Sequence, residues 1–328
     1  MKKLLSFLLI ISSTLFFCKA PYITIVVSQD GKGDFLSIQK AINSIRDLGS
    51  EEALIKIKKG IYKEKLVIGS SKQNITLEGE DSFSTIITYD DHTGKIDICS
   101  NEAMNTFNSY SFLISGDQIR LRNLTVQNST CGLGQGVALH VEGDKFVAEN
   151  CRILGCQDTL YLATNRSRQF YKNCFIEGTT DFIFGQATVV FKNCEIKSLS
   201  NSYITAASTE KDKKYGFVFI DCKLTAKDGV DKVYLGRPWR PYAKTVYVNT
   251  QMANHILPEG WNPWKGDKMF VDKEKTCFYA EFGSYSMDGK TDVSKRVDWS
   301  NQLTESQVKE YVNINNVLSG NDSWNPIK

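Results

Sequence analysis

Two aspartates hold the same position relative to a repeated cysteine. Asp158 follows Cys151 by seven residues, and Asp181 follows Cys174 by seven residues. If the two cysteines lie on neighbouring strands, the carboxyl groups lie about 5 Å apart on one outer face, because paired strands are about 4.8 Å apart. Two carboxylates that close do not both ionise readily, so one keeps its proton to higher pH. Such a pair supplies an acid together with a base or nucleophile.

Polar and aromatic side chains stand near this pair on successive repeats. Gln157 directly precedes Asp158, Gln135 stands one coil earlier, and Arg237 and Trp239 stand one coil later. Glutamine amides can donate to a developing oxyanion, and an arginine can orient a carboxylate through two hydrogen bonds. An indole face can stack on a sugar ring. Each segment alone also has a structural interpretation, but four segments on successive coils favour one site for acyl chemistry.

An internal repeat positions these residues. Five segments share apolar residues, then Asn or Asp, then Cys or Leu, then alternating apolar positions; they are centred on Leu124, Cys151, Cys174, Cys194 and Cys222. These centres are separated by 27, 23, 20 and 28 residues, a period typical of stacked architectures. The alternation has a period of two, which indicates strands. The sequence therefore predicts an all-β fold, a parallel β-helix with a ladder of Asn-Cys side chains inside the coil.

Short helices are expected near both ends of the solenoid. One begins at Ser37, carries its apolar residues on one face and stops at Gly49. The other follows the capping-box spacing of Thr304 and Gln307. We expect them to act as an N-terminal capping helix and a C-terminal helical or loop cap. Because no Pro-rich, Ser-rich or highly charged linker is present, residues 21–328 are expected to form one domain.

Residues 1–20 have the pattern of a signal peptide: a basic start, a short apolar run and a small residue, Ala20. The run is short for a membrane span; an uncleaved anchor and a lipid on Cys18 stay open. Cleavage after Ala20 removes Cys18 and three lysines, which leaves eight cysteines and equal numbers of acidic and basic residues. We therefore expect a secreted or extracytoplasmic protein (periplasm, cell surface or cell wall), free of the membrane after cleavage.

Composition and cysteine spacing exclude several classes. With 41% hydrophobic residues, 23 Gly and 6 Pro, the chain is neither disordered nor collagen-like. A formal net charge of +3 argues against nucleic acid as a partner. Four cysteines share one repeat position and are expected to pack as small buried hydrophobes, although disulfide pairing stays open. Three histidines and no CxxC pair argue against a zinc site.

The chain resembles the pectin methylesterase (pectinesterase) family in its QDTLY, DFIFG and LGRPW segments, which stand in this order and spacing. The likeness runs from Val27–Phe35 to Ser294–Trp299. The resemblance implies a single-stranded, right-handed parallel β-helix that hydrolyses galacturonate methyl esters in pectin. It implies no metal and no cofactor. The expected partner is methylated pectin, and we expect a monomer.

The resemblance also implies residue roles. Asp181 matches the nucleophile, and Asp158 matches the general acid that protonates methanol and then activates water. Gln135 and Gln157 match the groups that stabilise the oxyanion, and Arg237 matches the residue that orients the nucleophile. These roles agree with those inferred above from residue type and spacing.

Three aromatic residues are candidates for binding the sugar chain. Trp239 matches a residue that lines the sugar site, and Phe184 and Tyr161 are further candidates for the cleft, with packing beside it as the alternative.

Two other functions stay open. One is a chain-cleaving pectate lyase or polygalacturonase on the same solenoid, which needs calcium-binding acids or a different arrangement of acids. The other is a non-catalytic polysaccharide-binding solenoid, which does not need both aspartates and both glutamines.

Overall fold

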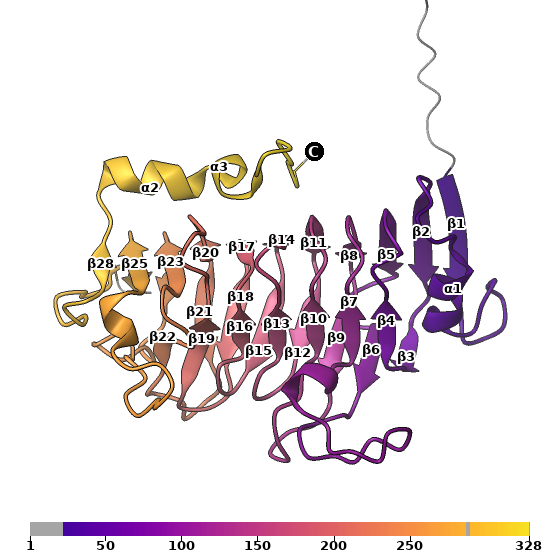
Figure 1. The fold of residues 1–328 in the computed structure, drawn as a ribbon, viewed down its shortest axis with the longest axis horizontal. Helices are drawn as coiled ribbons and strands as arrows, with labels where there is room; N and C mark the ends of the chain where they lie inside the picture. Colours follow the sequence, from indigo (N-terminus) through magenta and orange to yellow (C-terminus); the bar gives the residue numbers. More distant parts are fainter. Residues whose placement is uncertain (1–21, 287–288, 328) are drawn as a thin grey trace, which may run out of the picture.

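The structure is a computed structural model that describes residues 22–286 and 289–327. The predicted signal peptide, residues 1–20, lies outside the described residues. The described chain winds into a parallel β-helix in which three sheets run along the length of the solenoid (Figure 1). This confirms the predicted fold class. None of the described helices is long and apolar enough to cross a bilayer.

Sheet A is the largest sheet, with 11 strands that pair in parallel from coil to coil. In spatial order its strands are Tyr22–Val27 (β1), Glu52–Ile57 (β2), Ile75–Gly79 (β5), Arg120–Arg122 (β8), Phe146–Glu149 (β11), Arg168–Lys172 (β14), Thr188–Lys192 (β17), Phe217–Ile220 (β20), Lys244–Val248 (β23), Phe278–Phe282 (β25) and Asn301–Gln302 (β28).

Sheet B has 10 strands, parallel except for the last pair, β26 and β27. They are Gly60–Lys63 (β3), Thr85–Tyr89 (β6), Thr125–Asn128 (β9), Arg152–Leu154 (β12), Phe175–Gly178 (β15), Glu195–Ser198 (β18), Lys223–Ala226 (β21), Gln251–Met252 (β24), Tyr285–Ser286 (β26) and Gly289–Lys290 (β27).

Sheet C has 7 strands and positions the candidate site. Its strands are Leu66–Ile68 (β4), Phe112–Ile114 (β7), Leu139–Val141 (β10), Leu160–Leu162 (β13), Ile183–Gly185 (β16), Tyr203–Ala207 (β19) and Tyr234–Pro238 (β22).

The repeated Asn-Cys pair forms the corner between sheets A and B. Asn150, Asn173 and their equivalents have positive φ, near 54°, a left-handed conformation that a short polar side chain tolerates. The cysteines that follow are buried inside the coil, at 1–2% exposure for Cys151 and Cys174. The predicted inner ladder is therefore confirmed for cysteine but wrong for asparagine. The asparagines stack outside, where Asn173 Nδ2 donates to Asn150 Oδ1 at 3.2 Å.

The four ladder cysteines are free thiols, whereas Cys131 and Cys156 form a disulfide with Cα atoms 5.4 Å apart. The expectation that the ladder cysteines pack rather than pair is thus confirmed. The disulfide lies elsewhere, between two loops that adjoin sheet C.

Aromatic rings stack along the inside of sheet A. Tyr171, Phe191, Phe219 and Tyr247 occupy paired positions on β14, β17, β20 and β23. Ring centroids lie 4.5 Å apart between Phe191 and Phe219 and 4.4 Å apart between Phe219 and Tyr247. Such offset stacks add to the gain from burying the rings. A shift of one coil relative to the next would separate the stacked rings, so the core stabilises the register between coils.

The N-terminal helix α1 (Ile38–Ser44) begins as predicted. The side chain of its N-cap, Ser37, accepts a hydrogen bond from Lys40 N, and the helix buries its apolar face. It ends at Ser44, before the predicted stop at Gly49, because the buried Ile45 adopts an extended conformation.

The C-terminal helices are α2 (Glu305–Val312) and α3 (Ile314–Leu318), and the predicted capping box of Thr304 and Gln307 is present. Both helices run lengthwise along the outer face of sheet A rather than across the end of the solenoid (Figure 1). Val317 and Leu318, for example, pack with Phe170 and Val190.

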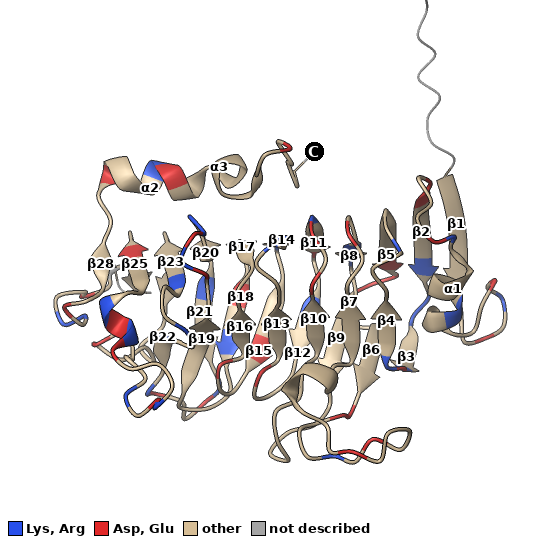
Figure 2. Cartoon of the chain, in the orientation of Figure 1, with Lys and Arg blue, Asp and Glu red and all other residues tan. Residues whose placement is uncertain are grey.

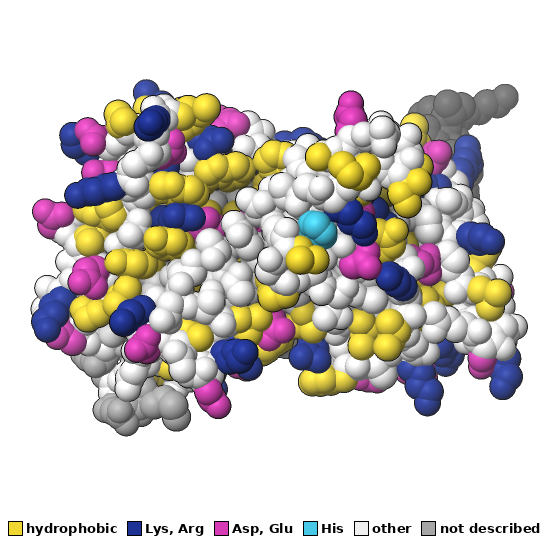
Figure 3. Space-filling view, turned by 90° about the horizontal axis from the view of Figure 1, so that it is seen from below, with side chains coloured by type: hydrophobic (Ala, Val, Ile, Leu, Met, Phe, Trp, Pro, Cys, Tyr) yellow, Lys and Arg dark blue, Asp and Glu magenta, His cyan; other side chains and the backbone are white. Residues whose placement is uncertain are grey.

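Acidic and basic residues are interspersed along the solenoid and in its loops (Figure 2). From below, hydrophobic side chains gather beside Lys and Arg over the C-terminal half of the molecule (Figure 3). On this face, acidic and basic side chains alternate with hydrophobic ones and do not form one region of a single charge.

The aromatic stack leads to a stability prediction. Phe191→Ala should lower the free energy of unfolding by about 3–5 kcal/mol, because it removes a fully buried ring and leaves a cavity. The control is Phe83→Ala, whose side chain is 72% exposed and which should cost less than about 1 kcal/mol. Urea unfolding followed by circular dichroism measures both. Equal losses would show that the stack does not stabilise the coil.

Candidate active site

Asp158 and Asp181 lie in register on neighbouring coils, each two residues before a strand of sheet C. Leu160 of β13 pairs with Ile183 of β16, and Asp158 N donates to Thr180 O at 3.1 Å. Both side chains line one cavity of about 250 Å³. The spacing to the ladder cysteines thus predicted the placement of the two aspartates.

Both aspartates adopt the left-handed region, with φ of 64° for Asp158 and 50° for Asp181. Asp tolerates this conformation better than most residues, but it still costs roughly 1–2 kcal/mol. Such strain clusters at functional sites, where surrounding structure holds it. The corner residues Asn150 and Asn173 adopt the same conformation, so the φ values describe how the two turns are built and do not by themselves mark a site.

The cavity gathers most of the residues singled out from the sequence. It is lined by Thr106, Phe107, Gln135, Gln157, Asp158, Asp181, Phe184, Ala206, Arg237, Trp239 and Trp264. Tyr161 does not line it.

Arg237 holds the carboxylate of Asp181. Its Nε donates to Oδ1 at 2.9 Å and its Nη2 donates to Oδ2 at 2.6 Å. The sequence interpretation placed Arg237 one coil beyond the aspartates, which is wrong by one coil. Strand β19 intervenes between β16 and β22. The residue between them in this row is Ala206, whose small side chain lets the long guanidinium reach across.

Two aromatic rings enclose the Arg237 guanidinium. The centroid of Tyr203 lies 3.9 Å from Arg237 Cζ, and that of Trp264 lies 3.6 Å from it. Cations are attracted to aromatic faces, more so when desolvated. The rings therefore fix the plane from which Arg237 donates to Asp181.

The two carboxyl groups have different proton affinities. Burial raises the pKa of Asp158 well above its usual value, the charge of Asp181 raises it further, and Arg237 opposes both. Burial also raises the pKa of Asp181, but less than that of Asp158, because hydrogen bonds and charge from Arg237, with the charge of Lys273, offset part of the rise. No hydrogen bond reaches the Asp158 carboxyl from the described residues. The arrangement therefore favours a protonated Asp158 beside an ionised Asp181.

Gln135 and Gln157 present free amides to the cavity. Neither side chain hydrogen-bonds to another part of the described chain, whereas their backbones are held. Gly136 N donates to Gln157 O at 3.1 Å, and Thr93 N donates to Gln135 O at 2.9 Å. Two unpaired amides on adjacent coils are available as donors to a bound group.

The aromatic candidates form one cluster at the cavity. Phe184 and Tyr161 stack with centroids 4.6 Å apart, and Phe184 meets Trp239 edge-on at 5.8 Å. Because Tyr161 stacks beneath Phe184 without lining the cavity, its packing interpretation is favoured. Sequence reasoning missed Phe107, in the 3₁₀ turn Thr106–Asn108 (η1), which is 46% exposed. The sequence feature that could have identified Phe107 is an aromatic residue within an otherwise polar turn.

Lys273 was also missed. It lies in the 3₁₀ turn Lys273–Lys275 (η2) and is 1% exposed. Its Nζ pairs with Asp267 at 2.7 Å and lies 4.4 Å from the Trp264 ring centroid. No sequence signal distinguished it, because a Lys-Glu-Lys run resembles a solvated surface segment.

Comparison with known proteins agrees with this geometry. The Pectinesterase family model matches residues 24–321. Pectinesterase 31 of Arabidopsis thaliana is 34% identical over 293 residues, which are 87% of this chain and 89% of that protein. A pectin methylesterase from carrot superposes with a TM-score of 0.82 at 31% identity, covering 90% of this chain and 93% of the carrot chain.

A pectin methylesterase in complex with a hexasaccharide superposes with a TM-score of 0.78 at 30% identity, over 92% of this chain and 98% of that one. These similarities extend over nearly the whole described chain and confirm the resemblance seen in its motifs. This chain belongs to the pectinesterase family.

Proposed function

We propose that this protein hydrolyses the methyl esters of galacturonate units in pectin, through Asp181 as nucleophile and Asp158 as general acid and base. Family membership supports the reaction class. The observation that supports the mechanism is the contrast between the two aspartates. Arg237 holds Asp181 through two hydrogen bonds, whereas Asp158 accepts no side-chain hydrogen bond from the described residues and has a pKa well above its usual value.

In the first half of the reaction, a carboxylate oxygen of Asp181 attacks the ester carbonyl carbon. The carbonyl oxygen becomes an oxyanion, which the amide N–H groups of Gln135 and Gln157 stabilise. Protonated Asp158 donates its proton to the ester oxygen as the carbon–oxygen bond breaks. Methanol leaves, and the galacturonyl group remains on Asp181 as a mixed anhydride.

In the second half, Asp158 is a carboxylate and takes a proton from water. The resulting hydroxide attacks the galacturonyl carbonyl, and the same two glutamines hold the oxyanion. Collapse expels Asp181 as a carboxylate and leaves galacturonic acid in the chain, which ionises in solution. Asp158 keeps the proton from water, so both aspartates return to their starting states.

The aromatic cluster supports binding of an uncharged face of the polymer. Phe107, Phe184, Trp239 and Trp264 line the cavity, and the solved relative bound to a hexasaccharide supports a chain segment as ligand. The local positive charge of Arg237 is neutralised by Asp181, which suits a neutral methyl ester better than a free carboxylate. We expect the protein to act as a monomer. The leader pattern of residues 1–20 indicates a location outside the cytoplasm.

The alternatives differ in their products. A lyase produces unsaturated sugars, a polygalacturonase lowers viscosity by cutting the chain, and a binding solenoid releases nothing. None of these functions requires an acid and a nucleophile beside two oxyanion donors.

Substitution of the aspartates tests the mechanism. Asp181→Asn should lower kcat for methanol release from methylated pectin by about 10⁴-fold or more, because the nucleophile is lost. Asp158→Asn should lower it by about 10²–10⁴-fold, because proton transfer to and from the reacting groups is lost. Methanol is measured enzymatically, with viscosity and unsaturated products recorded in parallel.

The matched control is Asp221→Asn. Asp221 occupies an exposed corner with φ of 52°, where other coils carry asparagine, so this variant should keep its kcat. A folded wild type that releases no methanol overturns the proposed function. Undiminished release by Asp181→Asn would leave the function intact but remove Asp181 as nucleophile.

The pH profile tests the division of roles. Activity should fall at low pH as Asp181 becomes protonated and at high pH as Asp158 loses its proton. Lys273 lowers the pKa of Asp181 but has no such effect on Asp158. Lys273→Met should therefore raise the pKa of Asp181 and move the acid limb of kcat/KM to higher pH, while the alkaline limb stays in place.

Lys273→Arg keeps the positive charge and should restore the acid limb. Arg237→Gln should move both limbs to higher pH, because Arg237 lowers the pKa of both aspartates. An acid limb that stays fixed in Lys273→Met and Arg237→Gln would show that it does not report Asp181.

A further inference from the structure

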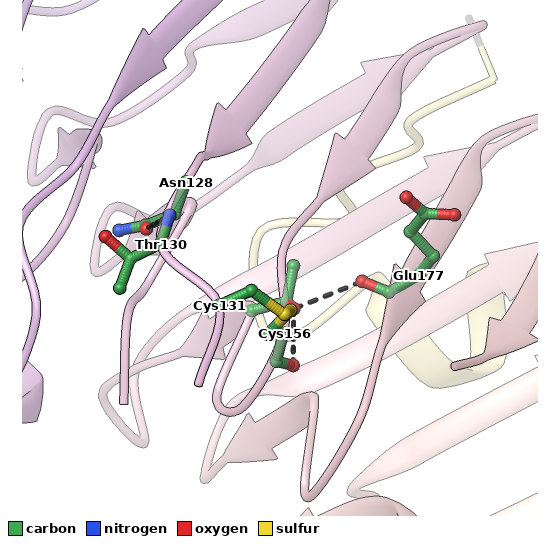
Figure 4. Close-up of a disulfide and its surroundings, with 6 residues drawn as sticks. Asn128, Thr130, Cys131, Cys156 and Glu177 are labelled. Atoms are coloured by element: carbon green, nitrogen blue, oxygen red, sulfur yellow. Dashed lines mark hydrogen bonds between the residues drawn. A yellow bond between two sulfur atoms is a disulfide. The ribbon is translucent and has the colours of Figure 1, made fainter. Parts of the chain in front are cut away.

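The Cys131–Cys156 disulfide joins the two loops that carry the glutamines (Figure 4). Cys156 directly precedes Gln157, and Cys131 stands four residues before Gln135. We propose that this disulfide is a positioning cross-link for the reaction, which keeps the Gln135 amide aligned with that of Gln157. This inference rests on the proposed function, in which both amides hold the oxyanion.

One side of the cross-link is firmly held. Cys156 is 8% exposed, and its carbonyl oxygen accepts hydrogen bonds from Thr159 Oγ1 at 3.1 Å and from Thr179 N at 2.9 Å. Thr159 Oγ1 also donates to Glu177 O at 3.1 Å on the next coil. The turn that carries Gln157 and Asp158 is thereby tied to the coil of Asp181.

The other side is weakly held. In the stretch Cys131-Gly132-Leu133-Gly134, no residue makes a hydrogen bond within the described part of the chain. Leu133 is 69% exposed, and both glycines have positive φ, 79° and 152°. Glycine carries the largest backbone entropy of any residue. Within the described residues, this stretch is linked to the next coil by the disulfide, and its last residue, Gly134, packs closely against Thr93.

The residues on either side of the stretch are held by hydrogen bonds of their own, so the disulfide restricts only the loop between them. Thr130 is anchored through its N–H to Asn128 Oδ1 at 2.9 Å and through Oγ1 to Asp90 O at 2.9 Å. Among the described residues, Gln135 is anchored through its carbonyl oxygen to Thr93 N, and the next residue, Gly136, donates to Gln157 O at 3.1 Å. The disulfide therefore does not build the coil, but it restricts the loop that sets the direction of the Gln135 side chain.

Alignment of an oxyanion donor has a large effect on rate. Loss of one donor costs about 10²–10³-fold in kcat, and a displacement of about 1 Å can cost about 10²-fold. A donor that is present but less well aligned should therefore lower kcat by less than these factors. Substrate binding relies mainly on the aromatic cluster, so the effect falls on kcat rather than on KM.

The test compares four proteins: wild type, Cys131→Ala/Cys156→Ala, Gln135→Ala, and the triple variant. Removal of the disulfide alone should lower kcat by about tenfold with KM changed by less than about twofold. In the Gln135→Ala background, the same removal should change kcat by less than about twofold, because the group that the disulfide positions is already absent.

An equal loss in both backgrounds would overturn the inference, since the disulfide would then act on the site as a whole. No loss in the first comparison would also overturn it. If Gln135→Ala itself keeps full kcat, the proposed oxyanion role of Gln135 fails, which is a separate result from the failure of the cross-link.

Reduction of the folded wild type provides a second measurement where the alanine variants fold poorly. Because the other cysteines in the described chain are free, dithiothreitol acts there on this bond alone: it is oxidised to its cyclic disulfide, and two thiols form. The reduced protein, checked by circular dichroism, should lose kcat about tenfold and regain it on reoxidation. Cys99→Ala, at an exposed free cysteine, is the control and should respond to dithiothreitol as wild type does.

Discussion

Register between successive coils is the constraint on which the whole molecule depends. Each coil hydrogen-bonds to the next in parallel, so residues at equal positions are stacked about 4.8 Å apart. Inside, this spacing suits like residues: Phe191 on Phe219, and Cys174 on Cys151. Outside, the same spacing forces the carboxyl groups of Asp158 and Asp181 together. The same spacing between coils therefore stabilises the core and brings together two carboxyl groups that would repel each other if both were ionised.

Arg237 reduces this repulsion because it forms an ion pair with only one of the two aspartates. It gives two hydrogen bonds to Asp181 and none to Asp158. A buried ion pair contributes little to stability, because desolvation offsets the attraction between the charges. Its effect here is on proton affinity: Arg237 orients Asp181 and offsets part of the pKa rise that burial causes there, whereas the pKa of Asp158 stays well above its usual value. The alanine at position 206 makes this possible, because a larger residue in that row would block the guanidinium.

The sequence was informative where the repeat determines the neighbours. The cysteine spacing predicted which aspartates stack, and the capping box of Thr304 and Gln307 predicted a helix start, because both depend on local or periodic patterns. The predicted neighbours were wrong or incomplete where loops of unequal length interrupt the repeat. The coil between Asp181 and Arg237 was overlooked, and Lys273 and Trp264 reach the site through a loop that the repeat does not describe. The direction of Asn173, outside rather than inside, depends on a left-handed corner that the alternation of apolar residues does not reveal.

The two properties that the aspartate pair needs are thus set by different parts of the chain. Their separation follows from the hydrogen-bonded pitch of β13 and β16, which the packed interior holds rigid. Their proton affinities follow first from burial, which raises both pKa values, and then from Arg237, two coils beyond Asp181, and Lys273 in a loop, which lower the pKa of Asp181. Because the aspartates are fixed by the core, changes in the surrounding loops alter the pKa values without moving the carboxyl groups. A solenoid can therefore keep two carboxyl groups in one geometry while its loops change the proton affinities of the pair.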